Sequence, residues 1–158
     1  MIKWKKIRGE GATAVRREYG RRFWWVLCAL WLAVIFLHSL MSAERSAAES
    51  GSLLAWLRGL FPALTEHALR KLAHFSEFAV LGLLLAQCLR VRITRPLLAG
   101  VLCALADETV QLFVSGRSGE VRDVWIDFSG VAAAVAASFL VRFLRSRRAS
   151  VPDPDEFT

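Results

Sequence analysis

Charged and polar side chains interrupt three apolar stretches of this chain at helical spacings. They are His74 with Glu77, Asp107 and Glu108 with Gln111, and Asp123 with Asp127. Carboxylates and an imidazole exchange protons near neutral pH and also bind cations. An ionised group costs several kcal/mol in an apolar medium, so such residues usually face a protein interior or a water-filled cavity and usually have a function. We therefore expect the function at these positions.

Length and composition place these residues within a membrane protein. The chain has 158 residues, 55% of them hydrophobic, and its apolar runs approach the roughly 20 residues that a membrane-spanning helix needs. The predicted spans are residues 23–41, 72–89, 97–114 and 124–144. Helices are favoured because open sheet edges in hydrocarbon would leave backbone groups unpaired. The predicted fold class is all-α, an integral membrane four-helix bundle.

Basic residues gather at alternate ends of the four spans. They lie at positions 3, 5, 6, 8, 16, 17, 21 and 22 before the first span, at 90, 92 and 95 between the second and third, and at 142, 145, 147 and 148 around the end of the fourth. Lysine and arginine near span ends mark the cytoplasmic side, so both termini are predicted to be cytoplasmic. The net charge of +7 is then a topology signal, and no nucleic-acid partner is expected.

Outside the spans, the sequence predicts two tails and one interfacial helix. Residues 1–22 form a basic cytoplasmic tail, residues 23–144 the transmembrane domain, and residues 145–158, whose end is rich in proline and acids, a disordered cytoplasmic tail. The first external loop contains residues 53–61, an apolar stretch that is too short to span and fits a helix lying at the membrane surface. Cys28, Cys88 and Cys103 have no metal-ligand spacing and are expected to pack as small apolar groups.

The predicted topology brings the charged residues into one layer, in the outer half of the membrane. Their helical faces continue inward with small residues, Gly100 and Ala104 on one helix and Gly130 and Ala134 on another. Small residues at this spacing let membrane helices approach closely, so the charges are expected to face one another. Five acids would then meet three cations, namely Glu77, Asp107, Glu108, Asp123 and Asp127 against Lys71, Arg117 and Arg122. The excess negative charge requires a shared proton, a protonated His74 or a bound cation.

The same residues carry a resemblance to the VanZ-like family of small multi-pass bacterial membrane proteins. The matching runs are Lys71 to Phe78 with Leu81 and Gly82, Asp107 to Phe113, Gly116 with Arg117 and Gly119, and Arg122 to Gly130. The resemblance covers residues 24–144 and departs at Asp127, where many relatives carry asparagine. It implies a location in the bacterial plasma membrane and a role at the cell envelope. The founding member is associated with low-level resistance to the glycopeptide teicoplanin, and the family has no agreed catalytic mechanism.

Within this layer, the chemistry of each side chain indicates its role. The candidates for catalysis by proton transfer are His74, Glu77, Asp107 and Glu108, and the candidates for ligand binding are Lys71, Gln111, Arg117, Arg122, Asp123 and Asp127. Arginine offers a planar fork for a phosphate or a carboxylate, and Lys71 and Arg122 could join Arg117 at headgroup depth. A divalent cation could be held by His74 and Glu77 opposite the other acids, although carboxylate bundles usually carry two Glu-x-x-His pairs and only one such pair is present here.

Three functions fit this pattern. The first is an envelope protein, whether an enzyme or a binding protein, that acts on an anionic lipid-linked cell-wall component from the outer half of the membrane. The second is a proton- or ion-coupled transporter or accessory channel, in which an oligomer would complete a path that the apolar inner halves of the spans lack. The third is a membrane scaffold whose buried polar network only sets the register of the helices. The expected partners are the lipid bilayer and, for the first function, the anionic envelope ligand.

Overall fold

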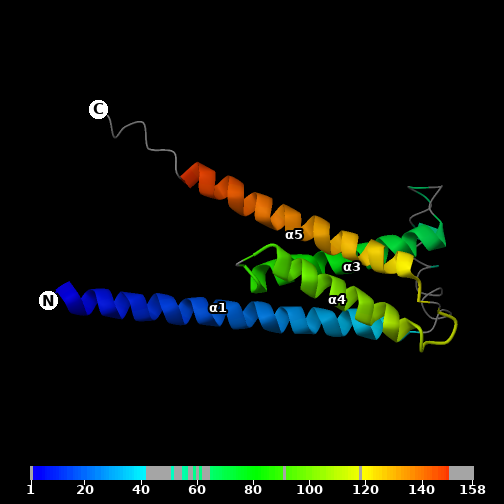
Figure 1. Ribbon diagram of the computed structural model, residues 1–158, viewed down its shortest axis with the longest axis horizontal. Coiled ribbons are helices and arrows are strands. Elements are labelled where there is room, and N and C mark those ends of the chain that lie inside the picture. Colours follow the sequence, from blue (N-terminus) through cyan, green and yellow to red (C-terminus); the bar gives the residue numbers. More distant parts are fainter. Residues whose placement is uncertain are drawn as a thin grey trace.

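Four long helices form the described part of the protein. The computed structural model describes residues 2–41, 51, 55–56, 59, 61, 65–90, 92–117 and 119–149, with side chains described from residue 20 to residue 148. Over these residues the long helices are α1 (Ile2–Ser39), α3 (Glu66–Cys88), α4 (Thr94–Gln111) and α5 (Val121–Ala149), and no strand is present. Figure 1 shows the N-terminal end of α1 and the C-terminal end of α5 at the same end of the molecule. The all-α prediction is confirmed.

The helices begin and end at other residues than the predicted spans; α3, for example, begins at Glu66 and not at residue 72. α1 begins at Ile2, so the basic segment up to residue 22 is a continuous part of it. α4 ends at Gln111 and not at residue 114, because the chain turns through Gly116, whose φ of 77° glycine adopts at little cost. α5 continues to Ala149, which corrects the expected disorder over residues 145–149. Its last turn is basic, and cations there interact favourably with the carbonyl end of the helix.

The predicted interfacial helix and the end of the C-terminal tail fall largely outside the described residues. Of residues 53–61, the structure describes 55, 56, 59 and 61. Trp56 and Phe61 among them are exposed, which suits side chains that contact a membrane surface. Residues 150–158 lie outside the described part of the chain.

Local signals in the sequence explain where three helices begin. Thr65 precedes α3, and its hydroxyl oxygen accepts a hydrogen bond of 3.1 Å from the backbone N–H of Ala68, which satisfies one of the donors of the first turn. Pro96 lies in the first turn of α4, where its missing N–H removes no helical hydrogen bond. Asp123 lies in the first turn of α5, beside the positive end of the helix dipole. The first residues of α3 and α5 and the last residues of α1 and α4 lie at the same end of the bundle (Figure 1).

An apolar core lies between the helices, with glycines where they approach most closely. Its fully buried side chains include Ile35 of α1, Phe78 and Leu81 of α3, and Val131 and Val135 of α5. A Cβ on Gly82 would lie 2.7 Å from the carbonyl oxygen of Val131, and a Cβ on Gly100 would collide with the Val131 side chain. The predicted faces of small residues, with Gly100, Ala104, Gly130 and Ala134 all buried, are confirmed as contact faces between helices.

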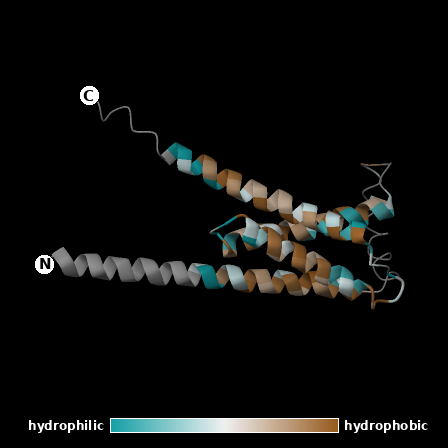
Figure 2. Ribbon diagram, viewed as in Figure 1, coloured by the Kyte–Doolittle hydropathy of each residue, from teal (hydrophilic) through white to brown (hydrophobic). Residues whose placement is uncertain are grey.

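The outer surface of the bundle is apolar, whereas several of its acids are buried, which is the reverse of a soluble protein. Exposed side chains include Phe23, Val26 and Leu30 of α1 and Leu98 and Leu102 of α4, and Figure 2 shows hydrophobic residues along the middle of the helices. By length and composition, two helices among the described residues could cross a membrane, Gly20–Ser39 and Val121–Arg148. α3 and α4, which carry most charges of the predicted layer, are not among them.

Candidate functional site

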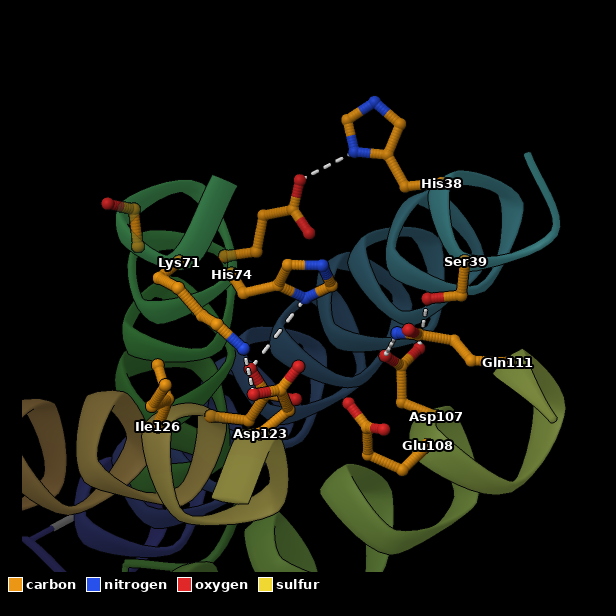
Figure 3. Close-up of polar contacts among 12 residues, drawn as sticks. His38, Ser39, Lys71, His74, Asp107, Glu108, Gln111, Asp123 and Ile126 are labelled. Carbon is orange, nitrogen blue, oxygen red and sulfur yellow. Dashed lines mark hydrogen bonds and ion pairs between the residues drawn. The ribbon is translucent and has the colours of Figure 1, made fainter. Parts of the chain in front are cut away.

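Polar side chains from all four helices meet at one end of the bundle (Figure 3). Five of them are buried, namely Ser39 from α1, Asp107, Glu108 and Gln111 from α4, and Asp127 from α5. His74 from α3 is partly buried beside them. These six residues are called the polar cluster below. Their meeting confirms the prediction that the charged faces of the helices point toward one another.

Asp107 is fully buried and hydrogen-bonded on both carboxylate oxygens. Ser39 Oγ donates to Oδ1 over 2.5 Å, and Gln111 Nε2 donates to Oδ2 over 2.9 Å. Hydrogen bonds to a carboxylate are stronger than neutral ones and fix its orientation. Ser39 reaches Asp107 because it lies four residues after Ile35, on the same buried face of α1. Gln111 lies one turn beyond Asp107 on α4.

Asp127 is as buried as Asp107 but lacks its hydrogen bonds. Its residue is 1% exposed, and neither of its carboxylate oxygens has a hydrogen-bond partner among the described residues. Nδ1 of His74 lies 3.7 Å from Oδ1 of Asp127, which is too far for a hydrogen bond. A buried carboxylate without a partner is costly, so something must compensate its charge or remove it.

Glu108 is the third buried acid of the polar cluster. Its Oε2 accepts a hydrogen bond of 3.0 Å from the backbone N–H of Glu120, whereas Oε1 has no hydrogen-bond partner among the described residues. In this part of the chain, none of Asp107, Glu108 and Asp127 forms an ion pair with a lysine or an arginine. If all three carboxylates are ionised, no direct ion pair with lysine or arginine among the described residues offsets their charge.

Ion pairs surround the polar cluster at its rim. Lys71 Nζ pairs with Asp123 Oδ1 between α3 and α5, and His38 Nδ1 lies 2.6 Å from Glu77 Oε1 between α1 and α3. Neither His38 nor Ser39 is among the predicted site residues. The signal that could have identified them is their place at the end of the first predicted span, at the depth of the charged layer.

A pocket of about 240 Å³ lies beside the polar cluster. Its lining includes His67, Arg70, Lys71, His74, Arg117 and Asp123. Arg117 Nη2 donates to the backbone carbonyl of His38 over a long 3.4 Å, and Arg117 forms no ion pair among the described residues. Desolvation by burial lowers the pKa of the Arg117 guanidinium, yet arginine stays protonated at physiological pH. The pocket thus contains a cation that forms no direct ion pair among the described residues, although the charges of Asp107, Glu108 and Glu77 act on it from a greater distance.

Arg122 belongs neither to the polar cluster nor to the lining of the pocket, although Glu120, which it contacts, lines the pocket. Its side chain is 71% exposed, and its Nη2 lies 3.5 Å from Oε2 of Glu120. Successive residues of a helix point in different directions, so the first turn of α5 can direct Asp123 toward α3 but not Arg122. Arg122 forms no ion pair with the buried acids in the described part of the chain, and its role in ligand binding stays a prediction.

Three side chains of the polar cluster could hold a metal ion. One ligand atom from each of His74, Asp107 and Asp127 lies within 4.8 Å of the others. Glu77, predicted to join His74 in such a site, contacts His38 instead. The structure therefore groups the imidazole with the acids of α4 and α5 and not with the acid one turn away on its own helix.

Comparison with known proteins gives one match. The sequence model of a protein family described as VanZ/LLP1 matches residues 24–142, a range that includes every residue of the polar cluster. None of the curated proteins and none of the solved structures matches the chain significantly.

Proposed function

The chain belongs to the VanZ/LLP1 family, and on that premise we propose that it is a multi-pass protein of a bacterial plasma membrane that binds an anionic, lipid-linked envelope ligand. The observation that carries the proposal is the pocket beside the polar cluster, where Arg117 has no ion-pair partner among the described residues. A guanidinium presents parallel N–H groups that match the oxygens of a phosphate or a carboxylate. An anionic headgroup would supply the partner that Arg117 lacks.

The apolar exterior supports a membrane location for all four helices. α1 and α5 are long and apolar enough on their own. On α4, Asp107 and Glu108 are buried, whereas Leu98, Leu102 and Leu105 are exposed. A helix whose charges face the interior of a bundle can remain in a bilayer that would reject the isolated helix. In this proposal residues 23–144 form the transmembrane domain, and residues 1–22 and 145–158 are cytoplasmic tails.

Reporter fusions test this orientation. Because basic residues mark cytoplasmic span ends, we expect cytoplasmic signals from reporters at the N-terminus, at Arg92 and at the C-terminus, and exterior signals at Gly51 and Ser115. Paired fusions to alkaline phosphatase, active only outside, and to a fluorescent protein, active only inside, give the measurement. An exterior C-terminus, or the same side for Gly51 and Arg92, would contradict the four-span arrangement.

The pocket suits a phosphate headgroup in size and charge. Its volume of about 240 Å³ corresponds to roughly eight waters at about 30 Å³ each, which is room for a phosphate with part of its hydration shell. Lys71 is paired with Asp123, and Arg70 lies 2.9 Å from Glu66, which leaves Arg117 as the main cation for a ligand. On the proposed topology the pocket lies at the exterior headgroup level, and acyl chains would contact the apolar outside of the bundle.

His74 adds a group for proton transfer. It lines the pocket, while its Nδ1 faces the Asp127 carboxylate at 3.7 Å. An imidazole is the side chain best suited to give or accept a proton near neutral pH. This arrangement supports chemistry on the bound ligand as well as binding, with His74 as the acid or base that reaches it.

The other two functions have less support. Directly inward of the polar cluster, Phe78, Leu81 and Val131 are fully buried, and these side chains provide no relay for protons or ions. A purely structural role explains Asp107, whose oxygens both accept hydrogen bonds. It does not explain Asp127, whose oxygens accept none among the described residues.

Variants scored for both abundance and phenotype separate ligand binding from packing. In a bacterial host that lacks the gene, we expect the chain to change susceptibility to a teicoplanin-type glycopeptide. Arg117→Ala is expected to abolish this change while membrane abundance stays near that of the wild type, because the Arg117 side chain forms no ion pair among the described residues.

Arg122→Ala is the matched control for this experiment, because it removes the same charge from an exposed side chain outside the pocket. It should leave both abundance and phenotype unchanged. The proposal fails if the phenotype of Arg117→Ala falls only in proportion to abundance, or if Arg122→Ala loses the phenotype equally.

A further inference from the structure

We propose that His74, Asp107 and Asp127 bind one divalent metal ion within the polar cluster. Each of three helices supplies one ligand: α3 the imidazole, and α4 and α5 a carboxylate. Their ligand atoms lie within 4.8 Å of one another. The site adjoins the pocket, since His74 also lines the pocket.

Asp127 gives independent support for a cation. Its residue is 1% exposed, both carboxylate oxygens lack a hydrogen-bond partner among the described residues, and Oδ1 points toward Nδ1 of His74. His74 Nδ1 is likewise buried without a hydrogen-bond partner among these residues. Two buried polar groups that face each other at 3.7 Å without bonding leave a position where an ion would satisfy both.

The spacing of the three groups fits coordination. Nitrogen and oxygen ligands lie about 2.1 Å from a tetrahedral ion, which places neighbouring ligand atoms about 3.4 Å apart. The 3.7 Å between His74 Nδ1 and Asp127 Oδ1 is close to that separation. The largest separation in the group is at most 4.8 Å, so the ligand atoms must move closer together for all three to bind one ion.

The surroundings of Asp107 prepare it as a ligand. Ser39 Oγ and Gln111 Nε2 each donate to one of its oxygens, and an oxygen that accepts one such bond keeps a second lone pair for a metal. Such outer partners fix the orientation of a metal ligand and raise its affinity. Ser39 and Gln111 are therefore positioning residues in this inference.

Charge and ligand chemistry indicate which ion would bind. Asp107, Glu108 and Asp127 are buried together without an ion pair to lysine or arginine among the described residues, and a divalent cation would offset most of that charge. One imidazole with two carboxylates favours Zn²⁺, Mn²⁺ or Fe²⁺. Ca²⁺ is disfavoured because it takes about six to eight oxygen ligands.

The metal site stands on the three buried ligands and does not need the proposed function. Only one step rests on the proposed function, namely that a phosphate oxygen of the pocket ligand completes the coordination shell. Catalytic zinc sites keep an open position of this kind for water or substrate. With the metal bound, the metal and not a proton on His74 would act on the ligand that Arg117 binds.

Metal titration of the full chain in detergent tests the site. After treatment with a chelator, the wild-type protein is titrated with Zn²⁺ or Mn²⁺ by calorimetry, and retained metal is counted by elemental mass spectrometry after desalting. We expect one ion per chain. Asp127→Asn and Asp107→Asn should each abolish retention, and Ser39→Ala should weaken binding by about 10- to 100-fold, as the loss of an outer partner does.

Glu66→Gln is the matched control, because it removes a carboxylate that pairs with Arg70 outside the polar cluster. It should retain one ion with unchanged affinity. Thermal melting verifies that each variant is folded, and the use of two separate aspartate variants protects the test against the misfolding of one.

The inference is overturned if the wild type retains no metal, or if the wild type and both aspartate variants retain it equally. Asp127 would then be a protonated acid. Binding of an anionic lipid is measured on the chelator-treated protein in parallel. Lipid binding without metal retention rejects only the metal site, and metal retention without lipid binding rejects only the proposed ligand.

Discussion

Replacing Gly130 with alanine is expected to lower the free energy of unfolding by about 3 kcal/mol, at the upper end of the usual cost of overpacking. The added Cβ would collide with the carbonyl oxygen of Phe75 and come within 3.0 Å of the backbone nitrogen of Ala79. These are backbone atoms of α3, which cannot move aside as a flexible side chain would. The helices must separate, and the buried contacts between α3 and α5 weaken together.

Thermal unfolding in detergent measures this effect. Gly20→Ala is the control, since a Cβ at Gly20 meets nothing within 4 Å and alanine is a better helix former than glycine by about 1 kcal/mol. Gly20→Ala should therefore melt at or slightly above the wild-type temperature, whereas Gly130→Ala should melt well below it. Equal melting of Gly130→Ala and wild type would show that α3 and α5 do not approach as closely as described.

The same contact sets the geometry of the polar cluster. Phe75 follows His74 on α3, and Gly130 lies less than one turn after Asp127 on α5, so the closeness of the two backbones determines how near the imidazole comes to the carboxylate. A separation of the helices would move His74 away from Asp127. Gly130→Ala should for this reason reduce both stability and any function of the site.

Helix number and the inward direction of the charges could be predicted from the sequence. Long apolar runs predict helices whatever their partners are, and polar residues spaced at three or four positions share one helix face. The small residues on those faces indicated which sides would pack, and Gly100 and Gly130 do lie against neighbouring helices. Each of these features is determined by the sequence of a single helix, without knowledge of how the helices pack.

The pairing of the charges could not be predicted, because it depends on the register between helices. Nothing along α1 shows that Ser39 will reach Asp107 or that His38 will reach Glu77. The sequence places Arg122 at the depth of Arg117, but it does not show which way the side chain points, because adjacent residues on a helix point in different directions. α5 ends later than its predicted span and α4 ends earlier. Both differences depend on local turns and helix termini, which a hydropathy pattern does not show.

Arg117→Ala is expected to weaken the binding of an anionic lipid by about 10- to 100-fold, because a hydrogen bond to a charged group contributes about 1.5–3 kcal/mol and each 1.4 kcal/mol is about tenfold in affinity. Arg117 carries this effect because the other cations of the pocket, Lys71 and Arg70, are already paired with acids. Arg122→Ala should bind the lipid as the wild type does.

The most direct test of this account is the affinity of the purified full chain for a long-chain polyprenyl phosphate, measured in neutral detergent with wild type, Arg117→Ala and Arg122→Ala. Phosphatidylcholine and inorganic phosphate serve as comparison ligands, to separate a lipid-linked phosphate from lipid or phosphate alone. The account predicts saturable binding of the polyprenyl phosphate that is stronger than binding of either comparison ligand and is selectively weakened in Arg117→Ala. Equal affinity in Arg117→Ala and Arg122→Ala, or no preference for the anionic lipid, would contradict it.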